Sequence, residues 1–309
     1  MFRARTATYR MALITGASSG IGRAFAEALP ASTGLLLVAR DAARLDQVSA
    51  RLASAGRTIA TLPADLTADQ GREAVIERAR QVGVDLLINN AGRGRLGRLL
   101  DHAPEEARAT VELNVVTPLV LTRALLPGML EQARTEGRRA GLIIVSSSTA
   151  FAPVPYFATY AASKAFDLVL AESLAEELRG EPIDVLALCP GATRTEFGRR
   201  AGFALESFPG AADPRAVAEE ALAALGRRTV LVSGRLRRAA YAPLTLPRAI
   251  AARGLGLAIG LLDRLQPTED RPGDDDVSPA ARKREASRAR ARSPSRTTPG
   301  RRRASRSSS

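Results

Sequence analysis

The stretch Met11-Ala12-Leu13-Ile14-Thr15-Gly16-Ala17-Ser18-Ser19-Gly20-Ile21-Gly22 joins a short apolar run to a glycine-rich loop. Residues 11–14 predict a buried strand that ends in a turn at Thr15-Gly16. Helix-forming residues follow over 23–29 and stop at Pro30. Such a loop lets backbone N–H groups approach a pyrophosphate at a helix N-terminus, where the helix dipole favours negative charge. The stretch predicts a phosphate-binding unit, with an ordinary glycine turn as the alternative.

Strands and helices alternate along the chain beyond this unit. Further strands are expected at 34–39, 58–62, 85–88, 141–145 and 183–189. Helices are expected at 41–55, 68–82, 104–134 and 160–179. Six strands interleaved with helices predict one α/β domain with a doubly wound parallel sheet, and a ligand at the carboxyl ends of its strands.

Unusual polar motifs fall at those strand ends or on the helix that follows. They are Asp65-Leu66, Asn89-Asn90-Ala91-Gly92, Ser146-Ser147-Ser148 and Pro190-Gly191. Because the carboxyl ends of parallel strands share one edge of the sheet, the motifs indicate a single shared site.

Arg40 ends the second expected strand. In dinucleotide-binding folds an acidic residue here holds the ribose hydroxyls, whereas a basic one accommodates a 2′-phosphate. Arg40 therefore favours NADP over NAD, with Arg23 as a possible helper. The neighbouring Asp41 argues in the other direction, and a solvated charge at a helix start is the alternative reading of Arg40.

The segment Tyr160-Ala-Ala-Ser-Lys164 places a phenol and an amine four residues apart. On a helix this spacing puts both side chains on one face, one turn apart. A phenol with a reference pKa of about 10 is a poor acid or base at neutral pH, but a fixed ammonium lowers that pKa. The pair is a candidate for acid–base chemistry, with a partly exposed helix face as the alternative.

Composition excludes several classes of site. The single histidine, His102, makes histidine-based zinc sites and Ser/His/Asp triads very hard to build, and no metal site is predicted. The single cysteine, Cys189, cannot form an internal disulfide, and its apolar surroundings indicate buried strand filler. No secretory signal is visible in residues 1–10, so a cytoplasmic protein is expected.

The net charge of +13 is concentrated at the end of the chain. Residues 280–309 hold eleven Lys or Arg and one acidic residue, a net charge of +10 that leaves +3 for the rest. Residues 266–309 are rich in Arg and Ser and are predicted to be disordered. Residues 235–265 are apolar and basic. Their longest uncharged run is too short for a transmembrane helix. They are predicted to form a helix that packs on the domain, on a partner or on a membrane surface.

Taken together, the motifs over residues 10–234 resemble the short-chain dehydrogenase/reductase (SDR) family. The matching residues are Thr15-Gly16-x3-Gly20-x-Gly22, Asn89-Asn90-Ala91-Gly92, Asn114, Ser147 thirteen before Tyr160, Tyr160-x3-Lys164 and Pro190-Gly191-x3-Thr195. The resemblance implies a Rossmann-type catalytic domain over 1–234. One departure is Thr117, where relatives often have glycine.

The resemblance also implies a catalytic set of four residues. Tyr160 would give its proton to a carbonyl oxygen as hydride arrives from the nicotinamide, and would act as base in reverse. Lys164 would favour the phenolate and hold the ribose, and Ser147 would bind the substrate oxygen. Asn114 would help to hold a water that connects Lys164 to solvent. Ser146 and Ser148 are alternatives to Ser147 on chemistry alone.

The remaining implied positions bind the cofactor, NADP(H) in preference to NAD(H). They are Gly16, Ser18, Ser19, Gly20, Ile21, Gly22, Arg40, Asp65, Leu66, Asn90, Ala91, Gly92, Tyr160, Lys164, Pro190, Gly191, Thr193 and Thr195. The substrate would lie under residues 196–211, where Phe197, Phe203, Leu205 and Phe208 suggest a lipophilic compound and Arg199 and Arg200 an anionic group.

The sequence thus predicts an NADP(H)-dependent oxidoreductase acting on a carbonyl or secondary alcohol, as a homodimer or homotetramer. The alternative is an NADP(H)-binding regulator or scaffold whose basic tail contacts nucleic acid or anionic membrane. The filled set of Asn114, Ser147, Tyr160 and Lys164 favours the enzyme.

Overall fold

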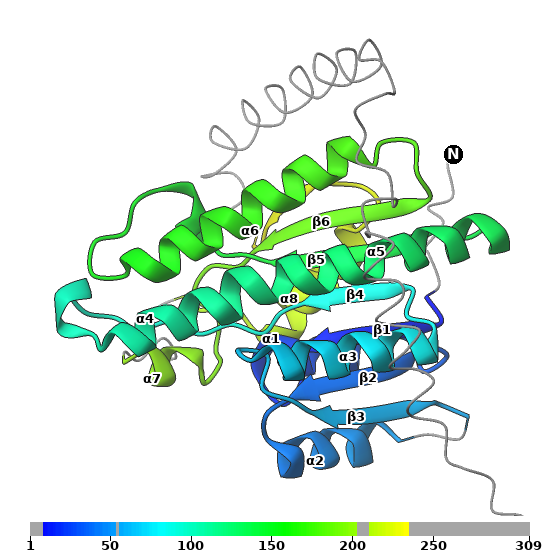
Figure 1. The fold of residues 1–309 in the computed structure, drawn as a ribbon, viewed down its shortest axis with the longest axis horizontal. Helices are drawn as coiled ribbons and strands as arrows, with labels where there is room; N and C mark the ends of the chain where they lie inside the picture. Colours follow the sequence, from blue (N-terminus) through cyan, green and yellow to red (C-terminus); the bar gives the residue numbers. More distant parts are fainter. Residues whose placement is uncertain (1–8, 54–55, 203–209, 235–309) are drawn as a thin grey trace, which may run out of the picture. The chain divides into compact units, whose positions relative to one another are not determined.

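Seven parallel strands form one sheet in the order β3-β2-β1-β4-β5-β6-β7 (Figure 1). The structure, a computed structural model of the chain, describes residues 9–53, 56–202 and 210–234. The strands are β1 (Met11–Thr15), β2 (Gly34–Ala39), β3 (Ile59–Pro63), β4 (Leu86–Asn89), β5 (Ala140–Val145), β6 (Ile183–Cys189) and β7 (Val230–Val232). The chain starts at the centre of the sheet, winds outward to β3, and crosses back to β4, which confirms the doubly wound topology.

Helices cover both faces of the sheet (Figure 1). They are α1 (Gly20–Ala28), α2 (Ala42–Leu52), α3 (Asp69–Val82), α4 (Pro104–Val111), α5 (Thr117–Glu136), α6 (Ala158–Glu177), α7 (Phe197–Ala201) and α8 (Pro214–Ala224). One core packs α1, α2 and α8 against residues such as Ile14 and Leu35. The other packs α3, α5 and α6 against residues such as Leu13 and Leu36, because alternate strand residues point to opposite faces.

Beyond shifts of one to three residues at element ends, the structure differs from the sequence expectation in two ways. The first is additional elements, among them α7, α8 and β7. The strand β7 follows Arg227 and Arg228 and pairs with β6 over only three residues. Three residues are too few for the sequence to show the alternation that is typical of a strand. Cys189 lies on the neighbouring strand and is fully buried, as expected.

The second difference lies in the segment expected as one helix over 104–134. Its middle, Glu112–Val116 (η2), is a π-helical turn that contains Asn114. Pro118 has no N–H to donate to the carbonyl of Asn114, and the N–H of Thr117 bonds to the carbonyl of Glu112, five residues earlier. The wider turn accommodates the proline and fixes where Asn114 points.

By length and composition, Pro104–Glu136 also passes as a helix that could cross a membrane. In the fold, Leu121, Leu125 and Met129 of α5 are buried in the core under the sheet. Core packing therefore accounts for its apolar character. The extension over 235–265, the basic tail over 266–309 and the segment with Phe203, Leu205 and Phe208 lie outside the described residues.

Candidate active site

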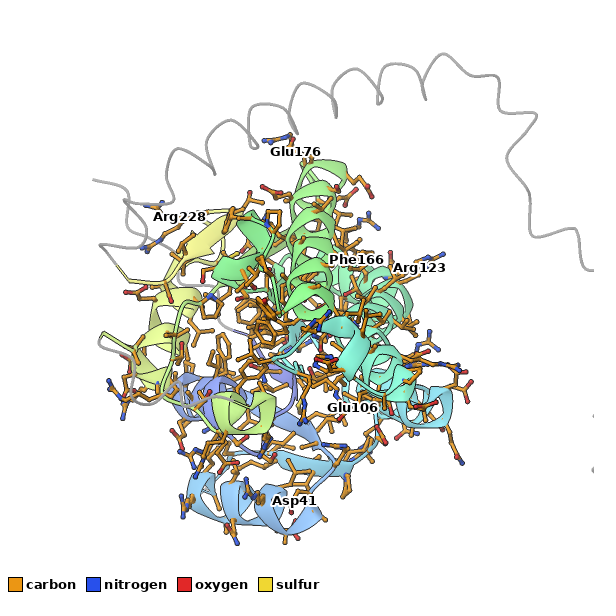
Figure 2. All side chains as sticks on the ribbon, turned by 90° about the vertical axis from the view of Figure 1, so that its left-hand side faces the viewer. Asp41, Glu106, Arg123, Phe166, Glu176 and Arg228 are labelled. Carbon is orange, nitrogen blue, oxygen red and sulfur yellow. The ribbon has the colours of Figure 1, made fainter. Side chains whose placement is uncertain are left out.

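A cleft of about 1160 Å³ opens at the carboxyl ends of the strands. Figure 2 looks onto this edge of the sheet, with Asp41 at the N-cap of α2 and Glu106 on α4 among the residues that line the cleft. All the predicted site residues line it except Gly22 and Asn114, which lie behind its wall. The topology thus brings together motifs that are separated by more than a hundred residues in the chain.

The glycine loop between β1 and α1 is packed too tightly for side chains. Gly16 has φ +67°, and a Cβ on Gly22 would lie 2.3 Å from the carbonyl oxygen of Gly16 and 2.5 Å from Nδ2 of Asn90. That Asn90 amide donates to the carbonyl of Thr15 at 2.8 Å. Ser19 is the N-cap residue of α1 and makes no side-chain capping hydrogen bond, so no side chain of Ser19 covers the first N–H groups of the helix. A pyrophosphate fits this cradle of backbone N–H groups.

At one end of the cleft, Arg40, Asp41 and Arg44 stand beyond β2. The Asp41 carboxylate accepts from the N–H of Arg44 at 3.0 Å, capping α2, and its other oxygen lies 3.3 Å from Nε of Arg44. Both carboxylate oxygens are therefore engaged locally rather than offered to a ribose. Arg44 also donates to Glu196 at 2.7 Å.

The loop after β3 is held by two hydrogen bonds to one backbone oxygen, the carbonyl of Leu66. The carbonyl of Leu66 accepts from Thr117 Oγ1 at 2.6 Å and from the buried Arg72 at 2.9 Å. Thr117, the residue that departs from the family pattern, therefore ties α5 to the loop that lines the cleft. In the same loop, hydrogen bonds from Thr67 outweigh burial and lower the pKa of Asp65.

Tyr160 and Lys164 lie on one face of α6, as the spacing predicts. The ammonium of Lys164 is 6.0 Å from the centroid of the Tyr160 ring. The ring stacks on Phe157, with centroids 4.4 Å apart, and is tilted against Phe197 at 5.2 Å. The phenol ring is therefore held between two aromatic rings in the wall of the cleft.

The pKa of Tyr160 differs in direction from the sequence expectation. Burial raises it, and this outweighs the lowering by the Lys164 charge and by a hydrogen bond with the Ser147 hydroxyl. The phenol is thus protonated at neutral pH, the form that donates to a carbonyl. A cation one turn away was visible in the sequence, but the extent of burial was not.

The structure separates the three consecutive serines by their contacts. Ser146 is buried and donates to the backbone carbonyl of Lys164 at 2.6 Å. Ser147 accepts from the N–H of Thr149 and acts on the Tyr160 phenol. Ser148 begins the short turn Ser148–Phe151 (η3). Of the three, Ser147 is the one whose hydroxyl lowers the pKa of the Tyr160 phenol.

Asn114 is fully buried and bonds to protein groups on both sides of its amide. Its oxygen accepts from the N–H of Arg93 at 2.9 Å, and its nitrogen donates to the carbonyl of Arg93 at 2.8 Å and to Ser163 Oγ at 2.9 Å. Ser163 in turn donates to the carbonyl of Tyr160 at 2.7 Å. Asn114 therefore joins the loop after β4 to the helix that carries Tyr160.

Asp167 is a site residue that the sequence analysis missed. It is buried, and its Oδ2 lies 2.9 Å from Nζ of Lys164. Lys164 also donates to the carbonyl of Val145 at 2.8 Å. The available signal was an acidic residue three positions after Lys164 within the apolar run Ala165-Phe166-Asp167-Leu168-Val169-Leu170. Arg44 and Glu196, which pair beside the cleft, were also missed.

The other end of the cleft is mainly apolar and aromatic. Leu96, Val154, Phe157 and Phe197 line it. Hydrogen bonds join its walls: Leu96 N–H donates to the carbonyl of Ala201, and Gly97 N–H donates to the carbonyl of Tyr156. Arg93, Arg95 and Arg200 add positive charge at its edge, although Arg200 is paired with Glu196.

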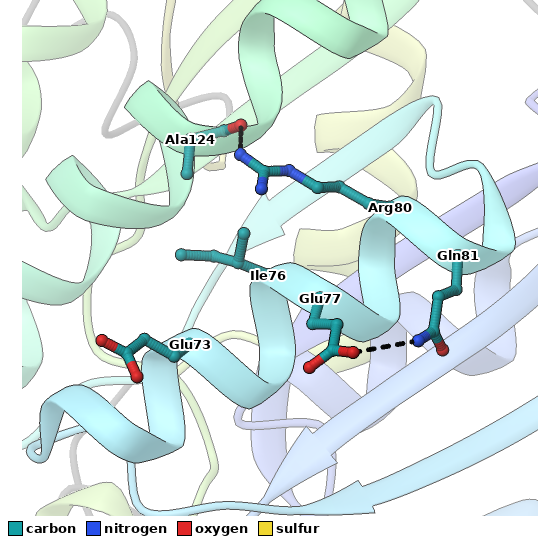
Figure 3. A pocket seen from close by; sticks show the side chains of 6 residues that line it. All are labelled: Glu73, Ile76, Glu77, Arg80, Gln81 and Ala124. Carbon is teal, nitrogen blue, oxygen red and sulfur yellow. Dashed lines mark hydrogen bonds between the residues drawn. The ribbon is translucent and has the colours of Figure 1, made fainter. Parts of the chain in front are cut away.

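A separate hollow lies between α3 and α5 (Figure 3). Arg80 crosses it and donates to the carbonyl of Ala124 at 3.1 Å, while Gln81 bonds to Glu77 on the same helix. It contains none of the predicted site residues. Within the described ranges, no three metal-ligating side chains gather at one point.

A doubly wound sheet with a phosphate cradle beside a tyrosine–lysine pair defines the class of nicotinamide-dependent oxidoreductases. The family model for short chain dehydrogenases matches residues 10–202. The chain is 38% identical over 191 residues to 1-deoxy-11-beta-hydroxypentalenate dehydrogenase of Streptomyces exfoliatus, which covers 60% of this chain and 68% of that protein. The matches to such curated relatives span 59% to 82% of their own length.

Solved structures agree with this match. A short-chain dehydrogenase from Sphingobium yanoikuyae in complex with NADPH superimposes with a TM-score of 0.67 at 31% identity, covering 85% of this chain and 98% of that one. A 3-ketoacyl-(acyl-carrier-protein) reductase from Brucella melitensis with NADH gives 0.63 at 28% identity, over 72% and 96%. The chain belongs to the short-chain dehydrogenase/reductase family and is an oxidoreductase.

Proposed function

We propose that the protein is an NADP(H)-dependent carbonyl reductase or alcohol dehydrogenase for a lipophilic substrate, with Tyr160 as its general acid and base. The observation that carries the proposal is that Tyr160, Lys164 and Ser147 line the same cleft as the glycine cradle, with the ammonium of Lys164 6.0 Å from the centroid of the Tyr160 ring. A protein that only senses a dinucleotide does not require a phenol between a cation and a hydroxyl.

The bound nicotinamide would supply hydride to a carbonyl or accept it from an alcohol. Ser147 donates a hydrogen bond to the substrate oxygen and orients it toward the phenol. Tyr160 gives its proton to that oxygen in reduction, and the positive charge of Lys164 stabilises the phenolate left behind. In oxidation, the phenolate of Tyr160 takes the alcohol proton. Asn114 keeps α6 and the loop after β4 in register during both directions.

The preference for NADP(H) rests on the cations beside β2. Arg40 and Arg44 line the part of the cleft that would receive a 2′-phosphate, and guanidinium groups bind phosphates through paired charge-assisted hydrogen bonds. Asp41 is already occupied as the cap of α2. The family alone does not decide this point, because the similar structures contain NADPH in one case and NADH in the other.

The aromatic and aliphatic walls formed by Val154, Phe157 and Phe197 support a lipophilic substrate. Exposed apolar residues on α4, α5 and α6, namely Val111, Leu119 and Val169, support a homodimer or homotetramer. We place the protein in the cytoplasm, in keeping with its single, buried cysteine.

The proposal is tested by oxidation of NADPH and NADH with a panel of ketones, aldehydes and 3-oxoacyl thioesters, for the wild type and Tyr160→Phe. Removal of the proton donor should lower kcat by about 10²–10⁴-fold while cofactor affinity changes little. Tyr156→Phe is the matched control, since Tyr156 is exposed and next to the same aromatic cluster. Turnover that survives Tyr160→Phe would refute the assigned role, and tight NADPH binding without turnover on any carbonyl would favour a regulatory protein.

A further inference from the structure

Lys164 and Asp167 form an ion pair that is almost entirely removed from water. Their side chains are 5% and 2% exposed, and Nζ lies 2.9 Å from Oδ2. A charge buried this deeply is costly unless it is paired, and loss of one partner leaves the other uncompensated. The pair therefore sets the charge state of Lys164 as well as its position.

The surroundings of Lys164 leave one hydrogen-bond direction free for function. An ammonium has three donors. One reaches the carbonyl of Val145 at 2.8 Å and a second reaches Asp167. Among the described residues no third acceptor is recorded for Nζ, which lies against Gly92, where a Cβ would be 3.6 Å away, and 6.0 Å from the centroid of the Tyr160 ring. Asp167 and Val145 together point Lys164 toward the reacting groups.

Asp167 is also the main source of negative charge for this ammonium. Burial alone would lower the pKa of Lys164, but the Asp167 charge, the Tyr160 interaction and the hydrogen bond that Lys164 donates to Asp167 together raise it. Cys189 on β6 is the other titratable group near the pair, and burial raises its pKa to about 12, so it stays neutral. Glu172 acts on Cys189 from farther along α6. Buried lysines without a partner have pKa values as low as about 5–6.

We infer that Asp167 is a positioning residue for the proposed reaction: it keeps Lys164 protonated and directed at Tyr160. The second oxygen of Asp167, Oδ1, is buried and has no hydrogen-bond partner within the part of the chain that the structure describes. A buried polar atom without a partner is uncommon in folded proteins and is often found where the group has a role in catalysis. The inference rests on the proposed function, yet the charge state of Lys164 can be measured without turnover.

The composition of the chain makes that measurement direct. Lysine occurs only twice in the sequence, at Lys164 and Lys283, among 45 basic residues. Protein labelled with ¹³C and ¹⁵N in lysine alone gives two sets of side-chain signals, and Lys283→Arg assigns them. In the wild type, the Lys164 signal should titrate at higher pH than that of Lys283. Titration of Lys164 at or below Lys283 would overturn the inference without any variant at Asp167.

The variant Asp167→Asn keeps the shape of the side chain and removes its charge. We expect Lys164 to titrate several pH units lower in this variant and to be largely neutral in the assay, because burial is then unopposed and fully buried lysines have pKa values as low as about 5–6. The matched control is Asp85→Asn, which removes another buried carboxylate at the opposite end of the strands, where it accepts from the N–H groups of Arg10 and Met11. Asp85→Asn should leave the Lys164 signal unchanged. A general loosening of the fold would shift the Lys164 signal in both variants, whereas the loss of the Asp167 charge shifts it in Asp167→Asn alone.

The pH profile of alcohol oxidation gives the second readout. With Lys164 neutral, the Tyr160 phenolate loses its main stabilising charge, so the acid limb of kcat/KM should move to higher pH by about one unit. Asp167 itself also disfavours the phenolate, but less than Lys164 favours it. A limb that stays in place or moves to lower pH would show that Lys164 remains charged without Asp167, and would overturn the inference. Absence of turnover in the wild type would refute the proposed function alone.

Discussion

Gly22→Ala is the sharpest test of the cofactor cradle. The added Cβ would stand 2.3 Å from the carbonyl oxygen of Gly16, whereas ordinary contact begins at 3.4 Å, so a gap of about 1.1 Å must open. The Gly16 oxygen is backbone, and the Asn90 amide on the other side is fixed by its bond to Thr15. Neither neighbour can rotate away, so the loop itself must move.

A loop that moves this far should lose at least one hydrogen bond to the charged pyrophosphate, worth about 1.5–3 kcal/mol, or about 10–100-fold in affinity. We therefore expect the dissociation constant for NADPH to rise about 10–100-fold. The free energy of unfolding should fall by about 1–3 kcal/mol from overpacking. Isothermal titration calorimetry measures the affinity, since the chain has no Trp for fluorescence transfer to the nicotinamide. Urea unfolding measures the stability.

Gly128→Ala is the matched control for this variant. Gly128 lies within α5, and a Cβ there would meet nothing within 4 Å. Alanine has the better helix propensity, so this variant should gain about 0.5–1 kcal/mol of stability and bind NADPH as the wild type does. If folded Gly22→Ala also bound NADPH with unchanged affinity, the glycine loop would not be the pyrophosphate cradle.

Two further predictions concern the charges at the edge of the cleft. Arg40→Ser should weaken NADPH binding by about 10–100-fold, which is the contribution of one charged hydrogen bond, and should leave NADH binding nearly unchanged. Calorimetry with both cofactors measures the two affinities. Equal losses for NADPH and NADH would show that Arg40 does not bind the 2′-phosphate. The hydrogen bond from Arg44 outweighs burial and lowers the pKa of Glu196 in the folded protein. The ionised Glu196 therefore stabilises the fold at pH values above 4.5, the ordinary pKa of glutamate, and this stabilisation is lost as the pH falls through the lower pKa of the folded state. Glu196→Gln should therefore lower the free energy of unfolding by less than about 1 kcal/mol at neutral pH, because the carboxylate is 34% exposed, and should not change it in strong acid. Urea unfolding at both pH values measures the two differences. Equal losses of stability at the two pH values would contradict the prediction.

The order of the elements was predictable because each carries its own local signal. Apolar runs of four to seven residues, closed by glycine or polar motifs, marked β1, β2, β4, β5 and β6 without reference to the rest of the fold. β7 escaped prediction because three residues are too few to show a period. The π-helical turn at Asn114 escaped because helix propensity does not distinguish a widened turn from a regular one.

Those parts of the candidate site that depend on residues close together in the sequence were predictable. Tyr160 and Lys164 lie one turn apart on a helix, so their proximity followed from spacing alone. The pKa of the phenol did not, because its burial depends on Phe197 of α7 as well as on Phe157 at the N-cap of α6. The choice among Ser146, Ser147 and Ser148 likewise depended on contacts that the strand end makes with α6.

The sequence by itself determined the chemical groups available, the strand–loop–helix order, and the edge of the sheet at which the motifs meet, since parallel strands in alternation with helices leave one such edge. Only the tertiary structure decided which charges are paired. Asp167 is one of 32 acidic residues in the sequence, and its side chain is indistinguishable from theirs until α6 packs on the sheet and excludes water around Lys164. Burial and pairing are properties of packed elements, and no local stretch of sequence contains them.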